Sequence, residues 1–421
     1  MDRPMKRRLV KALGLAGAAL AVAAGTSVPA QRLWAWPKTV QTGAGEEMQL
    51  PWSRWLPVTV ASRVAAPVGS QRVVEIKAES PGTYRVTLSL FGKIPWRGVP
   101  VKVGRPVYVV PGGESLGIVA RTRGVVVMAL SGVVVNGRTV EPAQDAGIER
   151  GDVITRVDGQ PALGVDMLEH HIMVDGRDHS PVRVWVAGSR SDRERQITPV
   201  WAAASRTWRI GATVQDHTTG VGTLTFFNPS TYRFTALGHS ISDGLTRRPV
   251  AIESALVTGA EIVGLVPASE HQPGQKVGVL AGPDNVSGTA DSNGPFGIVG
   301  RLHHTPIWGY RHAIPVAYPD QVHDGPAQIV TVLHGQKPET FSIEILKTAA
   351  QYEPEVKGLL FKVTDPRLLR ETGGIIQGMS GSPIIQNGRV VGAVTHVLVN
   401  RPSLGFGCYA YWMAQQRAYQ S

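Results

Sequence analysis

A glycine-rich stretch near the C-terminus, GGIIQGMSGSPII, contains a serine that could act as a nucleophile. Small residues on both sides of Ser380 let backbone N–H groups approach a reacting carbonyl, as acyl transfer requires. The same small residues also suit a β-turn without catalytic function. A serine hydroxyl is a poor nucleophile unless an imidazole accepts its proton, so the rest of the chain must supply a base and a group that orients it.

The nucleophile and its backbone donors can be assigned within this turn. Ser382 shares the turn, but Ser380 is favoured because Gly381 follows it and Gly378 lies two residues before it. This spacing predicts an oxyanion hole formed by the backbone amides of Gly378 and Ser380.

His239 is the candidate base. In the segment YRFTALGHSISD it follows a strand-like run and a glycine, so its ring is expected to project from a strand end. A single histidine is usually structural, and the combination with the Ser380 turn is what favours catalysis. His396, in the apolar segment GAVTHVLVN, is predicted to be a core histidine. Most other histidines in this part of the chain have polar neighbours and no metal-ligand spacing, so no metal or cofactor is expected.

Two carboxylates could orient the imidazole. Asp243 follows His239 closely, and Asp365 precedes Ser380 in the segment LLFKVTDPRLL. An aspartate before a proline is also a common start of a helix, so Asp365 could instead cap the segment PRLLRETGG. The residues by themselves leave this choice open.

The composition indicates a mainly β, globular chain. Its 421 residues suffice for two or three domains, and Gly (48) and Pro (30) punctuate β-branched runs such as RGVVVMALSGVVV. The net charge of +11 comes from dispersed Lys and Arg, which disfavours nucleic-acid binding. Cys408 is the only cysteine, which excludes an internal disulfide and a multi-cysteine metal site, and we expect it to be a buried, inert thiol.

The chain must position these residues through four consecutive regions. Residues 1–30 have basic residues, an apolar run and a small-residue site, VPA, which predict a signal peptide or a membrane anchor. The remaining chain is therefore expected outside the cytoplasm. Residues 31–96 read as a β-rich spacer. Residues 198–421 contain short strands between Gly, Pro and Asn turns, enough for two six-stranded barrels or a large sandwich.

Residues 97–197 resemble a PDZ domain of the kind attached to bacterial proteases. The segment DAGIERGDVITRVDGQPA is similar to the Ala-Gly-Ile-x-x-Gly-Asp stretch of these domains, and VDMLEHHIMV supplies the helix beside the groove. Such a domain adds a peptide as an extra strand and receives its terminal carboxylate on loop amides. A PDZ fold that serves only as a spacer is the alternative. The residues that resemble the carboxylate-binding loop are Ser115, Leu116, Gly117 and Ile118.

Two long segments, GVGTLTFFNPSTYRFTALGHSISD and KGLLFKVTDPRLLRETGGIIQGMSGSPIIQNGRVVGAVTHVLVN, resemble the SpoIVB peptidase family of endospore-forming bacteria. The resemblance implies a serine endopeptidase with a trypsin-like double β-barrel. It places the catalytic serine, histidine and aspartate on Ser380, His239 and Asp365. In such a fold the acid usually comes from the first barrel, so Asp243 remains the alternative to Asp365, which would then line the substrate pocket.

The resemblance also implies a role. The family is made in the forespore, enters the space between the two spore membranes, processes itself, and cleaves a regulator of an intramembrane metalloprotease, which activates a late mother-cell sigma factor. We therefore expect an exported, membrane-associated serine endopeptidase whose PDZ domain binds peptide or protein termini. The alternative is a catalytically silent PDZ scaffold for envelope proteins, against which the intact Ser380, His239 and Asp365 argue.

Overall fold

The structure is a computed structural model that describes residues 37–51, 58–67, 73–187, 192–242, 252–282, 285–308, 310–351, 353–416 and 419. The predicted signal or anchor segment, residues 1–30, lies outside the described residues, and so does Asp243. Within the described ranges no helix is both long and apolar enough to cross a membrane. The chain forms two compact units, which are described separately.

The first unit comprises residues up to 107 together with 316–323 and 350–354, and it is built from two small sheets. Alternate residues of its longer strands are buried, among them Val86, Leu88, Val99 and Val101, so one face of the sheet forms the core. The four-stranded sheet has the order β1 (Val40–Gly43), β7 (Ile94–Gly104), β6 (Gly82–Leu90), β3 (Val58–Ala61). The three-stranded sheet has the order β2 (Glu47–Pro51), β5 (Val73–Lys77), β4 (Ala65–Pro67), and a short 3-10 helix, η1, spans Pro319–Gln321.

The second unit contains two six-stranded β-barrels, which confirms the predicted mainly β, trypsin-like architecture. The first barrel has the order β9 (Ser115–Leu130), β20 (Ile252–Val266), β22 (Val286–Gly294), β23 (Gly297–Leu302), β19 (Arg233–Leu237), β18 (Ala212–Phe227). It closes because β18 pairs with β9. Its interior is filled by fully buried side chains such as Leu224, Phe234 and Ile298. Three further strands pair at its margins: β8 (Tyr108–Pro111), β21 (Gln275–Leu280) and β24 (Ile314–Pro315).

The second barrel is closed by its own ladder. Its order is β25 (Gly325–Thr331), β26 (Glu339–Thr348), β27 (Leu359–Val363), β30 (Leu404–Tyr409), β29 (Arg389–Val397), β28 (Pro383–Gln386). Two short helices, α5 (Pro366–Thr372) and α6 (Ala410–Ala414), accompany it. Cys408 is fully buried on β30 and burial raises the pKa of its thiol to about 12, so the expectation of a buried, inert thiol is confirmed.

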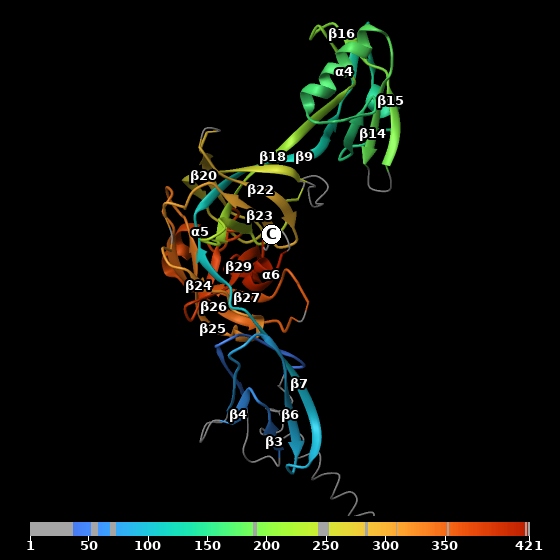
Figure 1. The fold of residues 1–421 in the computed structure, drawn as a ribbon. Coiled ribbons are helices and arrows are strands. Elements are labelled where there is room, and N and C mark those ends of the chain that lie inside the picture. Colours follow the sequence, from blue (N-terminus) through green and yellow to red (C-terminus); the bar gives the residue numbers. More distant parts are fainter. Residues whose placement is uncertain are drawn as a thin grey trace, which may run out of the picture. The chain divides into compact units, whose positions relative to one another are not determined.

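A smaller module interrupts the first barrel between its strands β9 and β18 (Figure 1). These two 16-residue strands pair from Ser115 and Thr223 to Leu130 and Ala212, so they belong to the barrel at one end and to the module at the other. We call residues 125–216 the inserted module. Its sheet has the order β15 (Asp192–Ile197), β14 (Val182–Ala187), β12 (Val153–Val157), β9, with β18 beside β9. The remaining elements are β10 (Val133–Val135), β11 (Arg138–Val140), α3 (Pro142–Asp145), β13 (Gln160–Pro161), α4 (Val165–Arg177), β16 (Val200–Ala202) and β17 (Thr207–Arg209).

This connectivity differs from the predicted order of a domain at 97–197 followed by a peptidase domain at 198–421. Strand β9 starts at Ser115 and is the first strand of the first barrel, so the peptidase fold begins before the module and resumes after it. The difference arises because pairing between distant strands, which decides domain boundaries, leaves no local mark in the sequence.

The predicted carboxylate-binding loop at Ser115, Leu116, Gly117 and Ile118 is wrong. These residues form the start of β9 and pair with β18 on one side and, from Leu116 on, with β20 on the other. Ser115, Leu116 and Ile118 are buried. Because this stretch lies inside a paired sheet and not at a free edge, it does not offer a loop of free amides to a peptide terminus.

Candidate active site

The turn that carries Ser380 joins α5 to β28 and is held by the first barrel. The hydroxyl of Thr223, on β18, donates to the carbonyl oxygen of Gly378 (2.8 Å), and its amide donates to the carbonyl oxygen of Ser380 (3.0 Å). Gly381 has a φ of +92°, and a Cβ there would collide with the backbone of Thr223 and Leu237. Thr223 is therefore a positioning residue that sequence reasoning missed, since a threonine within a strand carries no distinctive signal.

The amides predicted to form the oxyanion hole belong to Gly378 and Ser380. Among the described residues, neither the amide of Gly378 nor that of Ser380 has an acceptor. The amides of the neighbouring Gln377 and Met379 both have one. Gln377 donates to the carbonyl of Gly274 (2.8 Å) and Met379 to that of Ile376 (3.1 Å). Gly378 adopts a φ of +92°, which favours glycine. Two amides in one turn are thus available to an oxyanion.

His239 lies directly after β19 and Gly238, as the sequence predicted for a ring at a strand end. Its Nδ1 is 2.9 Å from the carbonyl oxygen of Ser240, so Nδ1 carries the proton and donates, which leaves Nε2 free to accept one. Burial lowers the pKa of this imidazole below its usual value. A neutral ring with an unprotonated Nε2 is the state that a general base needs.

Ser380 and His239 each lie against strand β29 of the second barrel. The hydroxyl of Ser380 donates to the carbonyl oxygen of Thr395 (3.3 Å), and a Cβ on Gly238 would lie 3.1 Å from the Thr395 side chain. The rings of His239 and His396 have centroids 5.3 Å apart. The described side chains make no hydrogen bond between Ser380 and His239, and the Ser380 hydroxyl must rotate from Thr395 to reach the imidazole.

His396 was predicted to be a core histidine, and this prediction is wrong. It is exposed on β29, whereas the preceding residues Val394 and Thr395 are buried. Partial desolvation and the charges of His239 and Lys357 lower the pKa of His396 to about 4. His396 is therefore a neutral ring beside the candidate base.

Asp365 caps α5. Its Oδ1 accepts from the amides of Arg367 (2.9 Å) and Leu368 (3.0 Å), and its Oδ2 accepts weakly from the amide of Ser342 (3.5 Å). In the described part of the chain neither oxygen bonds to an imidazole, and the Nδ1 of His239 already donates to a backbone carbonyl. The structure thus supports the capping role that the sequence left open, and it does not join Asp365 to His239.

The comparison with protein families decides the kind of enzyme. Residues 206–414 match the family described as SpoIVB peptidase S55. The chain belongs to this family. No curated protein matches the chain. The matched segment contains Ser380 and His239 together with the whole second barrel, and S55 peptidases are serine peptidases, so this protein is a serine endopeptidase of the SpoIVB sporulation type.

A buried lysine supports the nucleophile turn of this S55 peptidase. The amide of Lys276, on β21, donates to the carbonyl of Gln377 (2.9 Å), and its methylene groups pack against Gly378, where a Cβ would lie 3.1 Å away. Its Nζ donates to the hydroxyl of Thr331 on β25 (2.8 Å). Full burial lowers the pKa of the amine to about 7. Lys276 therefore links both barrels to the oxyanion turn, a role that a lone lysine in the sequence does not reveal.

Proposed function

We propose that this S55 peptidase cleaves a membrane-associated regulator of an intramembrane metalloprotease and thereby activates a late mother-cell sigma factor during sporulation. It is exported across the forespore inner membrane into the intermembrane space, where residues 1–30 serve as its signal or its anchor, and it processes itself. Family membership and the composition of residues 1–30 support this proposal. The observation that carries the catalytic part is that Ser380 and His239 both lie beside strand β29, and that the amides of Gly378 and Ser380 have no acceptor among the described residues.

The geometry supports acyl transfer by Ser380. The Nε2 of His239 accepts the hydroxyl proton while Oγ attacks the scissile carbonyl, and the amides of Gly378 and Ser380 stabilise the resulting oxyanion. His239 then gives the proton to the leaving amine, and water releases the acyl group by the same steps in reverse. The carbonyl of Ser240, which accepts from Nδ1, stabilises the protonated ring and keeps it in the productive orientation.

Incubation of the purified full-length protein with a peptide library and with the candidate regulator in vesicles tests this function. Wild-type protein should cleave both, and Ser380→Ala should cleave neither, as read by mass spectrometry of the products. Binding of the regulator without cleavage by wild-type protein would instead support the catalytically silent scaffold.

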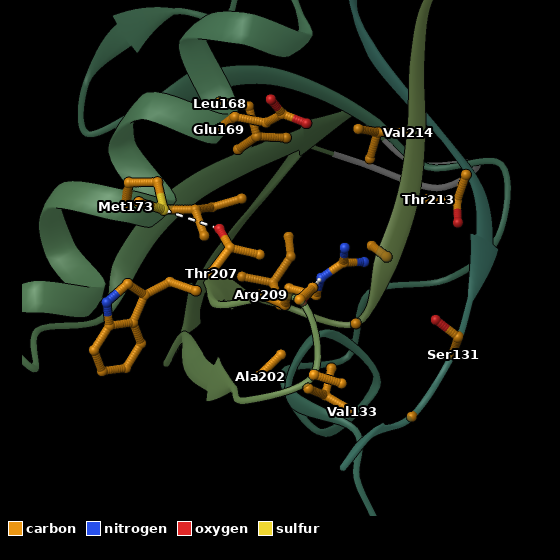
Figure 2. Close-up of a pocket in the computed structure, with 18 of the residues that line it drawn as sticks. Ser131, Val133, Leu168, Glu169, Met173, Ala202, Thr207, Arg209, Thr213 and Val214 are labelled. Atoms are coloured by element: carbon orange, nitrogen blue, oxygen red, sulfur yellow. Dashed lines mark hydrogen bonds between the residues drawn. The ribbon is translucent and has the colours of Figure 1, made fainter. Parts of the chain in front are cut away.

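We also propose that the inserted module binds extended peptides, at a different place from the one predicted. A cavity of about 660 Å³ lies between α4 and the start of β18 (Figure 2). Here β18 pairs with β9 along one edge, from Ala212 to Gln215, and none of the described strands occupies the other edge. An extended peptide can add to this edge as a further strand. The cavity wall on α4 includes Leu168 and Met173.

One end of this cavity suits a carboxylate. The turn at Ile210 and Gly211 precedes β18, and Gly211 has a φ of +76°. Within the described chain the amides of both residues lack acceptors, and the exposed Arg209 lies beside them on the cavity wall. This turn, in the segment RIGATV, therefore takes the role that was predicted for Ser115 to Ile118. Its sequence signal was a turn glycine before a strand, which is weak.

Binding of fluorescent peptides to Ser380→Ala protein tests this second proposal. A peptide with a free C-terminal carboxylate should bind more tightly than the same peptide with an amidated end. Met173→Glu places a charge in the cavity and should weaken binding at least about tenfold. Val174→Glu, on the same helix but outside the cavity wall, is the matched control. Equal binding by both variants would place the peptide elsewhere.

A further inference from the structure

Three side chains that could ligate a metal converge in the inserted module, away from the nucleophile and from the cavity wall. Asp158 lies in the turn between β12 and β13, while His171 and Asp175 lie four residues apart on α4 and so share one face of the helix. One ligand atom from each of the three lies within 4.8 Å of the other two. The three side chains are half-buried.

The contact between His171 and Asp158 is close but is not a hydrogen bond. The Nδ1 of His171 is 3.0 Å from Oδ2 of Asp158, yet this oxygen is buried and has no aligned donor. Two ligands at about 2.0 to 2.2 Å from one ion lie about 3.0 to 3.5 Å apart, so the separation fits two atoms that face a common cation. The φ of Asp158 is +46°, a positive value that aspartate tolerates in a turn.

The cluster contains two carboxylate oxygens that the described protein groups do not satisfy. Oδ2 of Asp175 is buried and has no hydrogen-bond partner, as is also true of Oδ2 of Asp158. Buried carboxylate oxygens are costly unless a donor or a cation compensates them.

Arg183 contacts the other carboxylate oxygen of Asp158. The amide of Arg183 donates to Oδ1 (3.1 Å), and its guanidinium lies 3.7 Å from the same oxygen, with a side chain that is 55% exposed. These contacts orient the carboxylate and leave its Oδ2 facing His171 and Asp175. Carboxylates that bind metals are commonly oriented in this way, by a hydrogen bond to the oxygen that does not face the ion.

We propose that Asp158, His171 and Asp175 bind a divalent transition-metal ion that links α4 to the turn after β12. One imidazole nitrogen and two carboxylate oxygens suit Zn²⁺ or a similar ion better than Ca²⁺ or Mg²⁺, which prefer oxygen ligands alone. Three protein ligands leave further positions for water. This site lies beyond the proteolytic function, and the sequence did not predict it because Asp158 comes from a different element than the two residues on the helix.

Titration of metal-free, full-length Ser380→Ala protein with Zn²⁺ in a calorimeter tests the proposal. One saturable site should be present in this protein and should weaken at least about tenfold in His171→Gln and in Asp175→Asn. His170→Gln is the matched control, since His170 is adjacent and exposed but lies outside the cluster, and it should bind as the parent does. Co²⁺ should give an absorption band that His171→Gln changes and His170→Gln does not.

Circular dichroism and melting of the metal-free variants separate loss of a ligand from loss of the fold. The proposal requires folded His171→Gln protein that no longer binds Zn²⁺ at this site. It is overturned if the parent protein has no saturable site, if His171→Gln and Asp175→Asn bind as tightly as the parent, or if His170→Gln abolishes binding as they do. Failure of this test leaves the proteolytic function untouched, since the readout is metal binding alone.

Discussion

Backbone amides without an acceptor in the described part of the chain occur both in the turn around Ser380 and in the turn at Ile210 and Gly211. The first turn is held by Thr223 and Lys276 of the first barrel and lies beside a half-buried histidine. The second turn lies at the end of a cavity, beside an arginine and an open strand edge. We therefore propose that similar backbone geometry serves catalysis in the first turn and peptide binding in the second, because the neighbouring side chains differ.

The largest expected effect is a loss of proteolytic activity without a loss of peptide binding, which distinguishes the two turns. Ser380→Ala should lower kcat/KM by about 10⁴ or more, because the hydroxyl that attacks the carbonyl is lost. Peptide binding to the inserted module should be unchanged. Ser382→Ala is the control, since the Ser382 hydroxyl is fully buried and has no hydrogen-bond partner among the described residues. A dead Ser382→Ala enzyme with an active Ser380→Ala enzyme would reverse the assignment.

Lys276→Met tests how strongly the nucleophile turn depends on its support. Loss of the Nζ contact leaves the Thr331 hydroxyl unsatisfied and should cost about 1 to 3 kcal/mol in the free energy of unfolding. The folded-state pKa of Lys276, about 7, lies below the ordinary 10.5, so the unfolded chain binds more protons between these values. Wild-type stability should therefore rise with pH from about 7 to 10.5 more steeply than that of Lys276→Met.

Denaturant unfolding of wild-type protein and of Lys276→Met, between about pH 7 and 10.5, measures this difference in the pH dependence of stability. Parallel pH profiles for the two proteins would show that the amine is solvated and does not support the turn. Lys362→Met, at an exposed position on β27, is a control for the loss of one positive charge.

Variants of Asp365 distinguish a catalytic role of this residue from a helix-capping role. Asparagine caps helices as well as aspartate does, so Asp365→Asn should keep most of its activity and stability, whereas Asp365→Ala should lose about 1 kcal/mol of folding stability. If Asp365 oriented His239, Asp365→Asn would instead lower kcat by about 10⁴ for every substrate. Profiling both variants on one peptide library, together with Asp243→Asn, decides between these roles.

The smallest effect concerns the two neighbouring histidines. Since burial lowers the pKa of His239, kcat/KM should rise with pH and level off with a midpoint below the ordinary 6.5. His396→Gln should change the free energy of unfolding by less than about 0.5 kcal/mol, because His396 is exposed. A large loss of stability in this variant would contradict the exposed position of His396. A pH profile without a histidine transition would contradict the assignment of the base.

Features that depend on local chemistry were predictable. The glycines around Ser380 identify its turn, because close backbone approach and positive φ values exclude larger residues. His239 at a strand end and the cap at Asp365 also follow from a few neighbouring residues. The wrong predictions concern Ser115 to Ile118 and His396, for which the direction of a side chain or the presence of a partner strand depends on residues far away in the chain.

The sequence by itself determined the mainly β composition, the nucleophile turn, the candidate base and the family resemblance, since each depends on residue types at short spacing. The tertiary structure decided that the inserted module, residues 125–216, interrupts the first barrel, that Thr223 and Lys276 support the turn, and that Asp158 lies beside His171 and Asp175. The physical reason is that strand pairing and side-chain burial are set by contacts between distant segments, whose energies no short stretch of sequence records.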